Sequence, residues 1–315
     1  MRNRLARLAS LLAVAALVAA GCGGPAAPPD AYEQLNTSLT STWSPVQVNV
    51  GVKVTAAGQT ITIDPKAIAF VVDTAAAKFA FHMSLPGADL GMPAGALDAL
   101  GIAGDSIDFD VIYAADALYM RSAMLKPTLR LILRSKVPAG DLTGWLKLGT
   151  KEELMALQAL SGGLKPQSSF APPSSGPGAM KASFEAAGIT LTDGGPVKHN
   201  GADARHITIA VDIDKLVADP SFRAGAGPQS GPTIAVMRSL SFAGELWIDP
   251  ANNRIVEADA HVTSIKDPTQ VGDVTITAHD PDGSVALDAP TSSVDVPLGT
   301  LISEMMKLIG KGAES

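Results

Sequence analysis

The sequence has almost no cysteine, since Cys22 is the only one among 315 residues. A single cysteine cannot form an intramolecular disulfide, and it leaves no cysteine pair to support a zinc site. Aromatic residues are also scarce, at 4% of the chain, although hydrophobic residues make up 46%. The core must therefore be built from Ala, Val, Leu and Ile.

Basic residues are too few for a nucleic-acid-binding protein. The three arginines at positions 2, 4 and 7 stand before an apolar run typical of a cleaved signal peptide, so they are left out of the charge of the mature protein. The remaining 21 Lys and Arg stand against 31 Asp and Glu, which gives a net charge of about −10. Binding to nucleic acid needs clustered Lys and Arg, and so does binding to an anionic lipid surface by charge alone. Neither mode fits this composition.

Long apolar runs are absent beyond the first twenty residues, where the run Leu8–Ala20 follows the three arginines. This run has the length of a signal-peptide core and is too short for a permanent membrane span. It ends in Val18-Ala19-Ala20-Gly21-Cys22, which resembles the lipobox of bacterial lipoproteins, although Ala19 stands where a lipobox usually has Leu. The sequence therefore predicts a signal peptide over 1–21 and lipidation of Cys22.

The segment after Cys22 is rich in Gly, Pro and Ala and has no hydrophobic periodicity, so residues 22–31 are expected to form a flexible tether. Stable anchoring needs more than one acyl chain, as the triacylated N-terminus of a bacterial lipoprotein provides. We therefore expect a protein bound to the cell membrane by its lipid, on the extracytoplasmic face. The remaining residues, 32–315, are expected to form one domain with loop insertions near 162–178 and 224–232.

Apolar and polar residues alternate over much of this domain, which indicates β-strands with one buried face and one wet face. The first hairpin combines Val46, Val48, Val50, Val52 and Val54 with the segment Thr60–Ile63. Further strands are expected at 67–73, 78–84, 106–114, 117–121, 189–192, 204–213, 239–248, 254–264 and 271–280. Short polar connections join many of these strands, which predicts an antiparallel meander.

Helical periodicity appears in short stretches between the strands. Helices are expected at 32–42, 94–100, 123–135, 150–160, 178–187 and 300–311, with a short one around Leu216. One wide antiparallel sheet would expose a large apolar face unless it curved around these helices. The fold class predicted is therefore α+β: a single large, strongly curved sheet, or half-barrel, with helices packed on its concave face around a hydrophobic cavity.

Several segments resemble the LppX/LprAFG lipoproteins of actinobacteria. They are Val111-Ile112-Tyr113 followed by Ala117-Leu118-Tyr119, then Trp145-Leu146-Lys147-Leu148, His199-Asn200-Gly201-Ala202-Asp203-Ala204, Glu245-Leu246-Trp247-Ile248-Asp249 and Arg254-Ile255-Val256-Glu257-Ala258. The resemblance covers most of residues 32–279. It implies a LolA/LolB-like fold that encloses a hydrophobic cavity, and a carrier of lipids or acylated glycolipids within or across the cell envelope.

Methionine side chains adapt to acyl chains of varied shape, although they also serve as ordinary core filling. The candidates for lining the cavity are Met92, Leu97, Met120, Met124, Leu125, Leu129, Leu133, Leu154, Met155, Leu157 and Met237. The expected partners are an acylated lipid or glycolipid, the membrane through the lipid anchor, and in addition a membrane transporter.

No catalytic, metal or cofactor motif is found in the sequence. The five histidines lack the spacing of a helical zinc site, the serines lack a Gly-x-Ser-x-Gly elbow, and no phosphate-binding loop or dinucleotide fingerprint is present. We therefore expect a protein that is not an enzyme and that needs no cofactor. The alternative to a lipid carrier is a structural or partner-binding envelope lipoprotein whose core is filled.

Overall fold

The computed structural model describes residues 30–40, 43–93, 95–99, 102, 104–133, 138, 140, 142–153, 176–220, 222–223, 231–296, 299–301 and 303. Cys22, with the predicted signal peptide and most of the tether, lies outside the described residues. So do most of the predicted loops at 162–178 and 224–232. None of the helices in the described part is long and apolar enough to cross a membrane.

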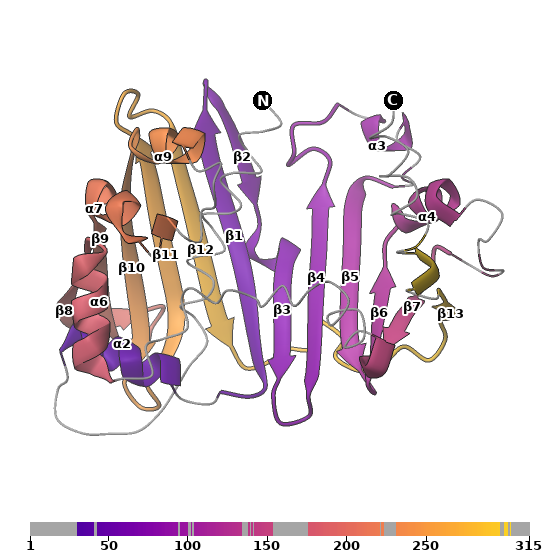
Figure 1. Ribbon diagram of the computed structural model, residues 1–315, viewed down its shortest axis with the longest axis horizontal. Coiled ribbons are helices and arrows are strands. Elements are labelled where there is room, and N and C mark those ends of the chain that lie inside the picture. The colour runs from indigo at the N-terminus through magenta and orange to yellow at the C-terminus, as the bar shows by residue number, and fades with distance from the viewer. Residues whose placement is uncertain are drawn as a thin grey trace. The chain divides into compact units, whose positions relative to one another are not determined.

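Thirteen strands form a single mixed sheet in the order β13-β7-β6-β5-β4-β3-β1-β12-β11-β10-β9-β8, with β2 paired to β1 (Figure 1). The strands are β1 (Val46–Ala56), β2 (Gln59–Ile63), β3 (Ile68–Asp73), β4 (Lys78–Pro86), β5 (Ser106–Ala114), β6 (Ala117–Arg121), β7 (Leu146–Thr150), β8 (Ile189–His199), β9 (Ala202–Val211), β10 (Leu240–Asp249), β11 (Arg254–Ser264), β12 (Val271–His279) and β13 (Val294–Asp295).

The helices are short and stand between the strands. They are α2 (Ala31–Thr40), the 3-10 turn η2 (Pro65–Ala67), α3 (Ala96–Ala99), α4 (Leu125–Leu133), α6 (Pro177–Ala186), α7 (Ile213–Ala218) and α9 (Gly231–Met237). The predicted fold class, α+β with one large sheet and several helices, is therefore confirmed. One detail differs, because β13 pairs with β7 in parallel where only antiparallel pairs were expected.

The chain divides into two compact units. Unit 1 comprises residues 1–43, 48–65 and 167–279, and unit 2 comprises residues 44–47, 66–166 and 280–315. Each unit builds its own core.

In unit 1, the helices α2 and α6 supply apolar residues to one buried cluster with strands β8 to β12. Leu35 of α2 and Met180 of α6 are almost completely buried there, with Ile248 of β10 and Ile276 of β12. The Tyr32 hydroxyl accepts a hydrogen bond from the Leu191 backbone N–H at 3.1 Å, which fixes the start of α2 to β8. The amphipathic periodicity that predicts a helix at 32–42 therefore reflects a real contact face.

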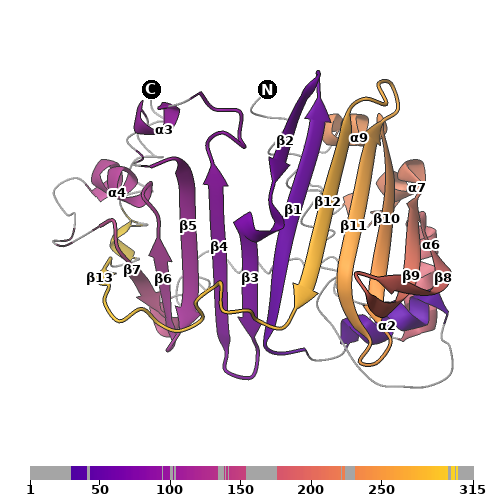
Figure 2. The ribbon, with the colours of Figure 1, turned by 180° about the vertical axis from the view of Figure 1, so that it is seen from behind.

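In unit 2, the strands β3 to β6 are covered on one side by the segment that follows β12. Val285, Leu287 and Ala289 pack on a buried cluster that includes Val71 and Ile112. Figure 2 shows this yellow segment crossing β4, β5 and β6 on its way to β13. One face of these strands is therefore closed by the protein's own chain.

The helix α4 covers the β6–β7 edge of unit 2. Its Leu129 and Leu133 are buried against Leu146 and Leu148 of β7. Pro127 lies in the first turn of this helix, where a missing backbone N–H costs little. The helix predicted at 123–135 is therefore present with slightly shorter bounds.

Candidate functional site

The second face of β3, β4, β5 and β6 is lined by thirteen apolar side chains, and we call it the apolar face. All thirteen are partly exposed, and none is charged. The strand register places them in rows across the strands. They are Ile68, Phe70, Val72, Phe79, Phe81, Met83, Leu85, Ile107, Phe109, Val111, Tyr113, Leu118 and Met120.

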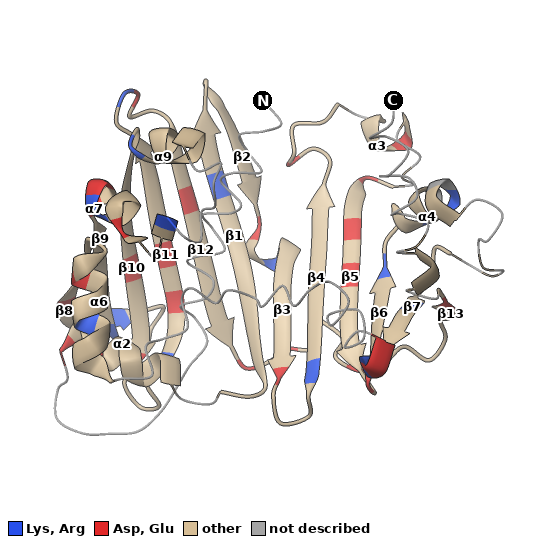
Figure 3. Cartoon of the chain, viewed as in Figure 1, with Lys and Arg blue, Asp and Glu red and all other residues tan. Residues whose placement is uncertain are grey.

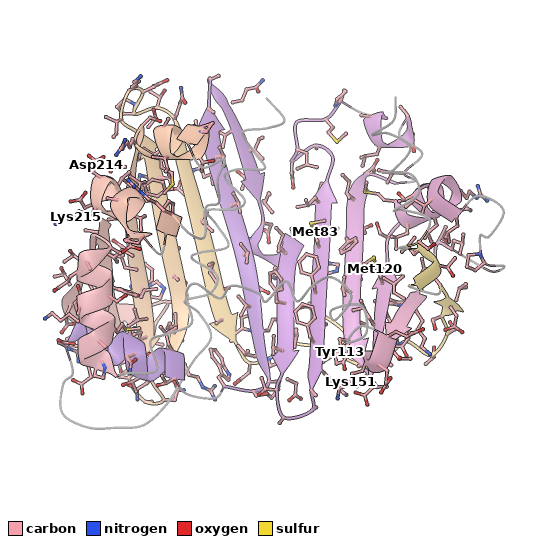
Figure 4. The ribbon with its side chains drawn as sticks, viewed as in Figure 1. Met83, Tyr113, Met120, Lys151, Asp214 and Lys215 are labelled. Carbon is pink, nitrogen blue, oxygen red and sulfur yellow. The ribbon has the colours of Figure 1, made fainter. Side chains whose placement is uncertain are left out.

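The register explains why these side chains share one side of the sheet. Phe70 lies opposite Phe81, which lies opposite Val111, which in turn lies opposite Met120. Directly opposed residues in antiparallel strands point to the same side, and residues two apart on one strand do the same. Met83 and Met120 are labelled on this side in Figure 4.

Aromatic rings form the centre of the apolar face. The rings of Phe70 and Phe81 have centroids 4.8 Å apart, and those of Phe81 and Phe109 are 6.0 Å apart. Phe79 lies 6.4 Å from Phe70. Four of the eight phenylalanines in the chain are therefore gathered in one patch, although aromatic residues are scarce elsewhere.

The apolar face is bordered but not covered by the described helices. Leu118 and Met120, on its β6 border, contact the cluster that α4 forms with β7. The members on β3, β4 and β5 belong to none of the buried clusters that the described residues form. A continuous, partly exposed apolar area of this kind is typical of a surface that binds an apolar ligand or partner.

The charged side chains of these strands lie on the opposite face. Asp110, which is 8% exposed, accepts hydrogen bonds from Arg121 Nε at 3.0 Å and Nη2 at 2.8 Å. His82 Nδ1 lies 2.7 Å from the other oxygen of the same carboxylate. This row of ion pairs connects β4, β5 and β6, and it leaves the apolar face free of charge. In Figure 3 the charged positions of β3 and β4 lie only at their shared turn.

The predicted cavity-lining residues have different positions in the structure. Met120 lies on the apolar face, and Leu125, Leu129 and Leu133 lie in the α4 cluster beside it. Met124 is 44% exposed, which places it outside the core. The enclosed cavity itself stays a prediction.

The other predicted lining residues lie away from the apolar face or outside the described part. Leu97 of α3 is buried next to Gly87, beyond the end of β4, and Met92 is partly exposed in the loop before α3. Met237 is buried in unit 1. Leu154, Met155 and Leu157 lie outside the described residues.

Most residues of the apolar face were not predicted as lining residues, although the sequence carries a signal for them. The strands at 68–73 and 79–81 have apolar residues at nearly every position, instead of alternating with polar ones. Strands of this kind have both faces in contact with apolar material. Here the segment 285–289 covers one face, and the other is the apolar face.

Unit 1 has a shallow surface depression of about 520 Å³ at the start of α2. Lys181 lies 3.8 Å from Asp30 at its rim, and Arg205 Nε donates a hydrogen bond to Asp193 at 3.0 Å. The hydrogen bond from Arg205 lowers the pKa of Asp193, so this pair stays ionised. Because acids and bases pair with each other here, the depression offers little to an acyl chain.

Unit 1 also has a polar sheet face, where His199 stacks on Trp247 with centroids 4.2 Å apart and lies 3.0 Å from Glu257. Burial raises the pKa of the neighbouring Asp259. Within the described part of the chain, no group of three or more His, Cys, Asp or Glu residues could hold a metal ion.

No protein-family model matches the chain, and no curated protein matches it either. Several solved structures match the chain. The lipoprotein LppX from Mycobacterium tuberculosis is 14% identical, with a TM-score of 0.31 over 77% of this chain and 89% of that chain. LprF from Mycobacterium bovis is 12% identical, with a TM-score of 0.30 over 79% of this chain and 90% of that chain.

A putative outer membrane lipoprotein-sorting protein domain from Vibrio parahaemolyticus is 8% identical, with a TM-score of 0.22 over 84% of this chain and 92% of that chain. LppX and LprF are lipoproteins of the group that the sequence resembles.

Proposed function

We propose that this protein is a membrane-anchored lipoprotein that binds the acyl chains of a lipid or glycolipid on the apolar face of unit 2. The observation that carries the proposal is the uninterrupted grid of partly exposed apolar side chains on β3 to β6. A polar protein surface would not bind an acyl chain in water, whereas this face would.

The physical basis is the hydrophobic effect. Each methylene group that leaves water contributes roughly 0.8 kcal/mol, so one long acyl chain gains enough free energy for binding without any ionic contact. The apolar face also loses water when the ligand binds. Its aromatic centre, with Phe81 between Phe70 and Phe109, offers wide and rigid contact area.

The lipid anchor proposed on Cys22 supports this function by placing the protein at its source of ligand. The eight residues from Cys22 to Pro29 span at most about 28 Å when fully extended. The first described residue, Asp30, would therefore stay within this distance of the membrane surface. We propose that the protein carries its lipid within or across the cell envelope, and that a membrane transporter is a further partner.

Lipid analysis of the purified protein tests the proposal. Full-length protein is made in an actinobacterial host, and bound lipids are identified by native mass spectrometry and solvent extraction. The proposal expects at least one acylated lipid bound to the wild-type protein and much less bound to Phe81→Glu. Lipid-free wild-type protein that instead captures another envelope protein through this face would favour the partner-binding alternative and contradict the proposal.

A further inference from the structure

One end of the apolar face is polar, and three residues form it. The Tyr113 hydroxyl donates a hydrogen bond to Asp116 Oδ1 at 3.4 Å, and Lys151 Nζ lies 3.7 Å from the same oxygen. The backbone N–H of Lys151 also donates to the Asp116 carbonyl at 2.8 Å. We call Tyr113, Asp116 and Lys151 the polar rim.

The polar rim is held in place by the turn between β5 and β6. Ala115 and Asp116 have φ angles of 50° and 53°, so both lie in the left-handed region that a tight two-residue hairpin turn requires. Tyr113 belongs to the rim and to the apolar face at once, because its ring lies in the row that contains Phe79 and Leu118. Figure 4 shows Tyr113 and Lys151 close together at this end of unit 2.

At the other end, the last row of the apolar face is aliphatic, and the exposed Asp105 lies beyond it. Leu85 lies opposite Ile107 in the last row, and the buried Leu97 of α3 follows next to Gly87. Six residues separate Ile107 from Tyr113 along β5, a distance of about 20 Å. The face therefore ends beside the polar rim on one side and in two aliphatic side chains on the other.

The charges beside the polar rim disfavour an anionic headgroup. Lys151 and Asp116 balance each other, and the exposed Glu152 and Glu153 follow directly in the chain. The carboxylates of Glu152 and Glu153 would repel a phosphate group placed beside Lys151, so the phosphate would gain little from that lysine. The Tyr113 hydroxyl, the Asp116 carboxylate and the Lys151 ammonium group can still donate and accept hydrogen bonds.

We propose that the ligand lies along β4 and β5 with an uncharged, hydroxyl-bearing headgroup at the polar rim and its chain ends at Leu85 and Ile107. This inference rests on the proposed function, since it gives the direction and the headgroup chemistry of the lipid on the apolar face. Asp116 accepts from a ligand hydroxyl, and Lys151 donates to one. Asp116 is 70% exposed and Lys151 is 55% exposed at their side chains, so both can reach a ligand.

The direction is tested with tryptophan as a reporter at each end of the apolar face. Ile107→Trp marks the apolar end, and Phe79→Trp marks the end at the polar rim. Fatty-acid probes carry bromine either near the carboxyl group or near the chain terminus. Terminal bromine should quench Ile107→Trp at least twofold more than Phe79→Trp, and bromine near the carboxyl group should do the reverse. The opposite pattern, or equal quenching, overturns the direction.

The headgroup is tested with two lipids that share one palmitoyl chain, monopalmitoylglycerol and palmitoyl lysophosphatidic acid. The full-length protein should bind the glycerol lipid about tenfold more tightly, and Asp116→Lys should reverse this preference. Glu33→Gln, which removes an exposed acid from α2 in unit 1, should leave the preference unchanged. Equal or tighter binding of the phosphate lipid overturns the headgroup assignment and leaves the apolar face as the site. Binding of neither lipid overturns the proposed function, and this inference with it.

Discussion

Phe70 of β3 and Phe81 of β4 lie directly opposite each other, and their ring centroids are 4.8 Å apart. Both rings are partly exposed, and both stand at the centre of an apolar face that the described helices border but do not cover. A cross-strand aromatic pair stabilises a sheet by up to about 1 kcal/mol, so some of this contact serves the fold. The remaining exposed ring surface is what a bound acyl chain would cover.

A charge at the centre of this pair should abolish lipid binding. Phe81→Glu places a carboxylate where the acyl chain would lie, and a carboxylate cannot be buried there without a partner. We expect the affinity for a fluorescent fatty-acid analogue to fall at least tenfold in a direct titration. Phe242→Glu changes a partly exposed phenylalanine on β10 of unit 1, and it should bind like the wild type. Equal losses in both variants would point to a general effect on folding.

Leucine truncation should separate the core of unit 2 from its apolar face. Leu146 of β7 is fully buried against α4. The substitution Leu146→Ala should therefore lower the free energy of unfolding by roughly 2 to 5 kcal/mol. Leu85→Ala, on the partly exposed face, should cost much less in the lipid-free protein. Urea denaturation of both variants measures the difference. Similar losses would mean that the face is packed like a core, as the filled-core alternative requires.

The stability of unit 1 should respond to pH through Asp259. Burial raises the pKa of this carboxyl group, and the nearby Glu257 and Glu245 raise it further, whereas a hydrogen bond from Thr275 lowers it. A folded-state pKa above the unfolded value of about 3.9 means that stability falls as the pH rises from there through the folded-state pKa. Asp259→Asn removes this penalty, so it should unfold at a higher temperature than the wild type at pH 7.

Replacing Asp193 by Asn should change the unfolding temperature in the opposite direction to Asp259→Asn. The hydrogen bond from Arg205 lowers the pKa of Asp193, so this pair stabilises the fold above the unfolded pKa and is lost as the pH falls through the folded-state pKa. Asp193→Asn should therefore be less stable than the wild type at pH 7, and the difference should shrink in acid. Melting curves of both variants from pH 3 to pH 8 that move in the same direction would contradict this assignment.

Removal of the proposed anchor should separate attachment from lipid binding. Cys22→Ala removes the only thiol of the chain, so no lipid can be attached there. We expect this variant to leave the membrane fraction, and intact-mass measurement should show no acyl modification. The wild-type protein should carry the added mass of the anchor. An unmodified wild-type Cys22 would contradict the lipoprotein assignment.

Much of the strand pattern could be predicted because alternation is a local property of the sequence. The hairpin of β5 and β6 has the bounds that its sequence predicts, and the alternating valines of β1 form the first strand. The two strands of the β7–β13 pair were missed for a physical reason. Val294 donates a hydrogen bond to the carbonyl of Trp145, a partner about 150 residues away, and no local pattern reveals such a pairing.

The prediction of one wet face on β1 is wrong at its start. Gln47 and Asn49 were expected in water, but they are only 1% and 7% exposed. The Gln47 side chain donates a hydrogen bond to the Ser284 hydroxyl at 3.0 Å, and the Asn49 side chain lies 3.1 Å from His279 Nε2. These partners follow more than 200 residues later, so their effect on burial could not be read locally.

The candidate site could be predicted only in part, because methionine and leucine content was used where strand pattern was decisive. Met120 belongs to the apolar face, and Leu129 to the α4 cluster beside it. Phe70 and Phe81 were not considered, although the strands that contain them are apolar on both sides. Which of the two sides the segment at 285–289 covers depends on the path of that segment, and this path is a tertiary feature.

Photo-crosslinking with an acyl-chain probe shows where on the protein an acyl chain is bound. A fatty acid with a diazirine in its chain is bound to the full-length protein and irradiated, and the labelled residues are mapped by peptide mass spectrometry. If the acyl chain binds the apolar face, the labels should lie on β3, β4 and β5, above all around Phe70, Phe81 and Val111. Labels that fall mainly in unit 1, or on the opposite face around Val71 and Ile112, would contradict binding at the apolar face.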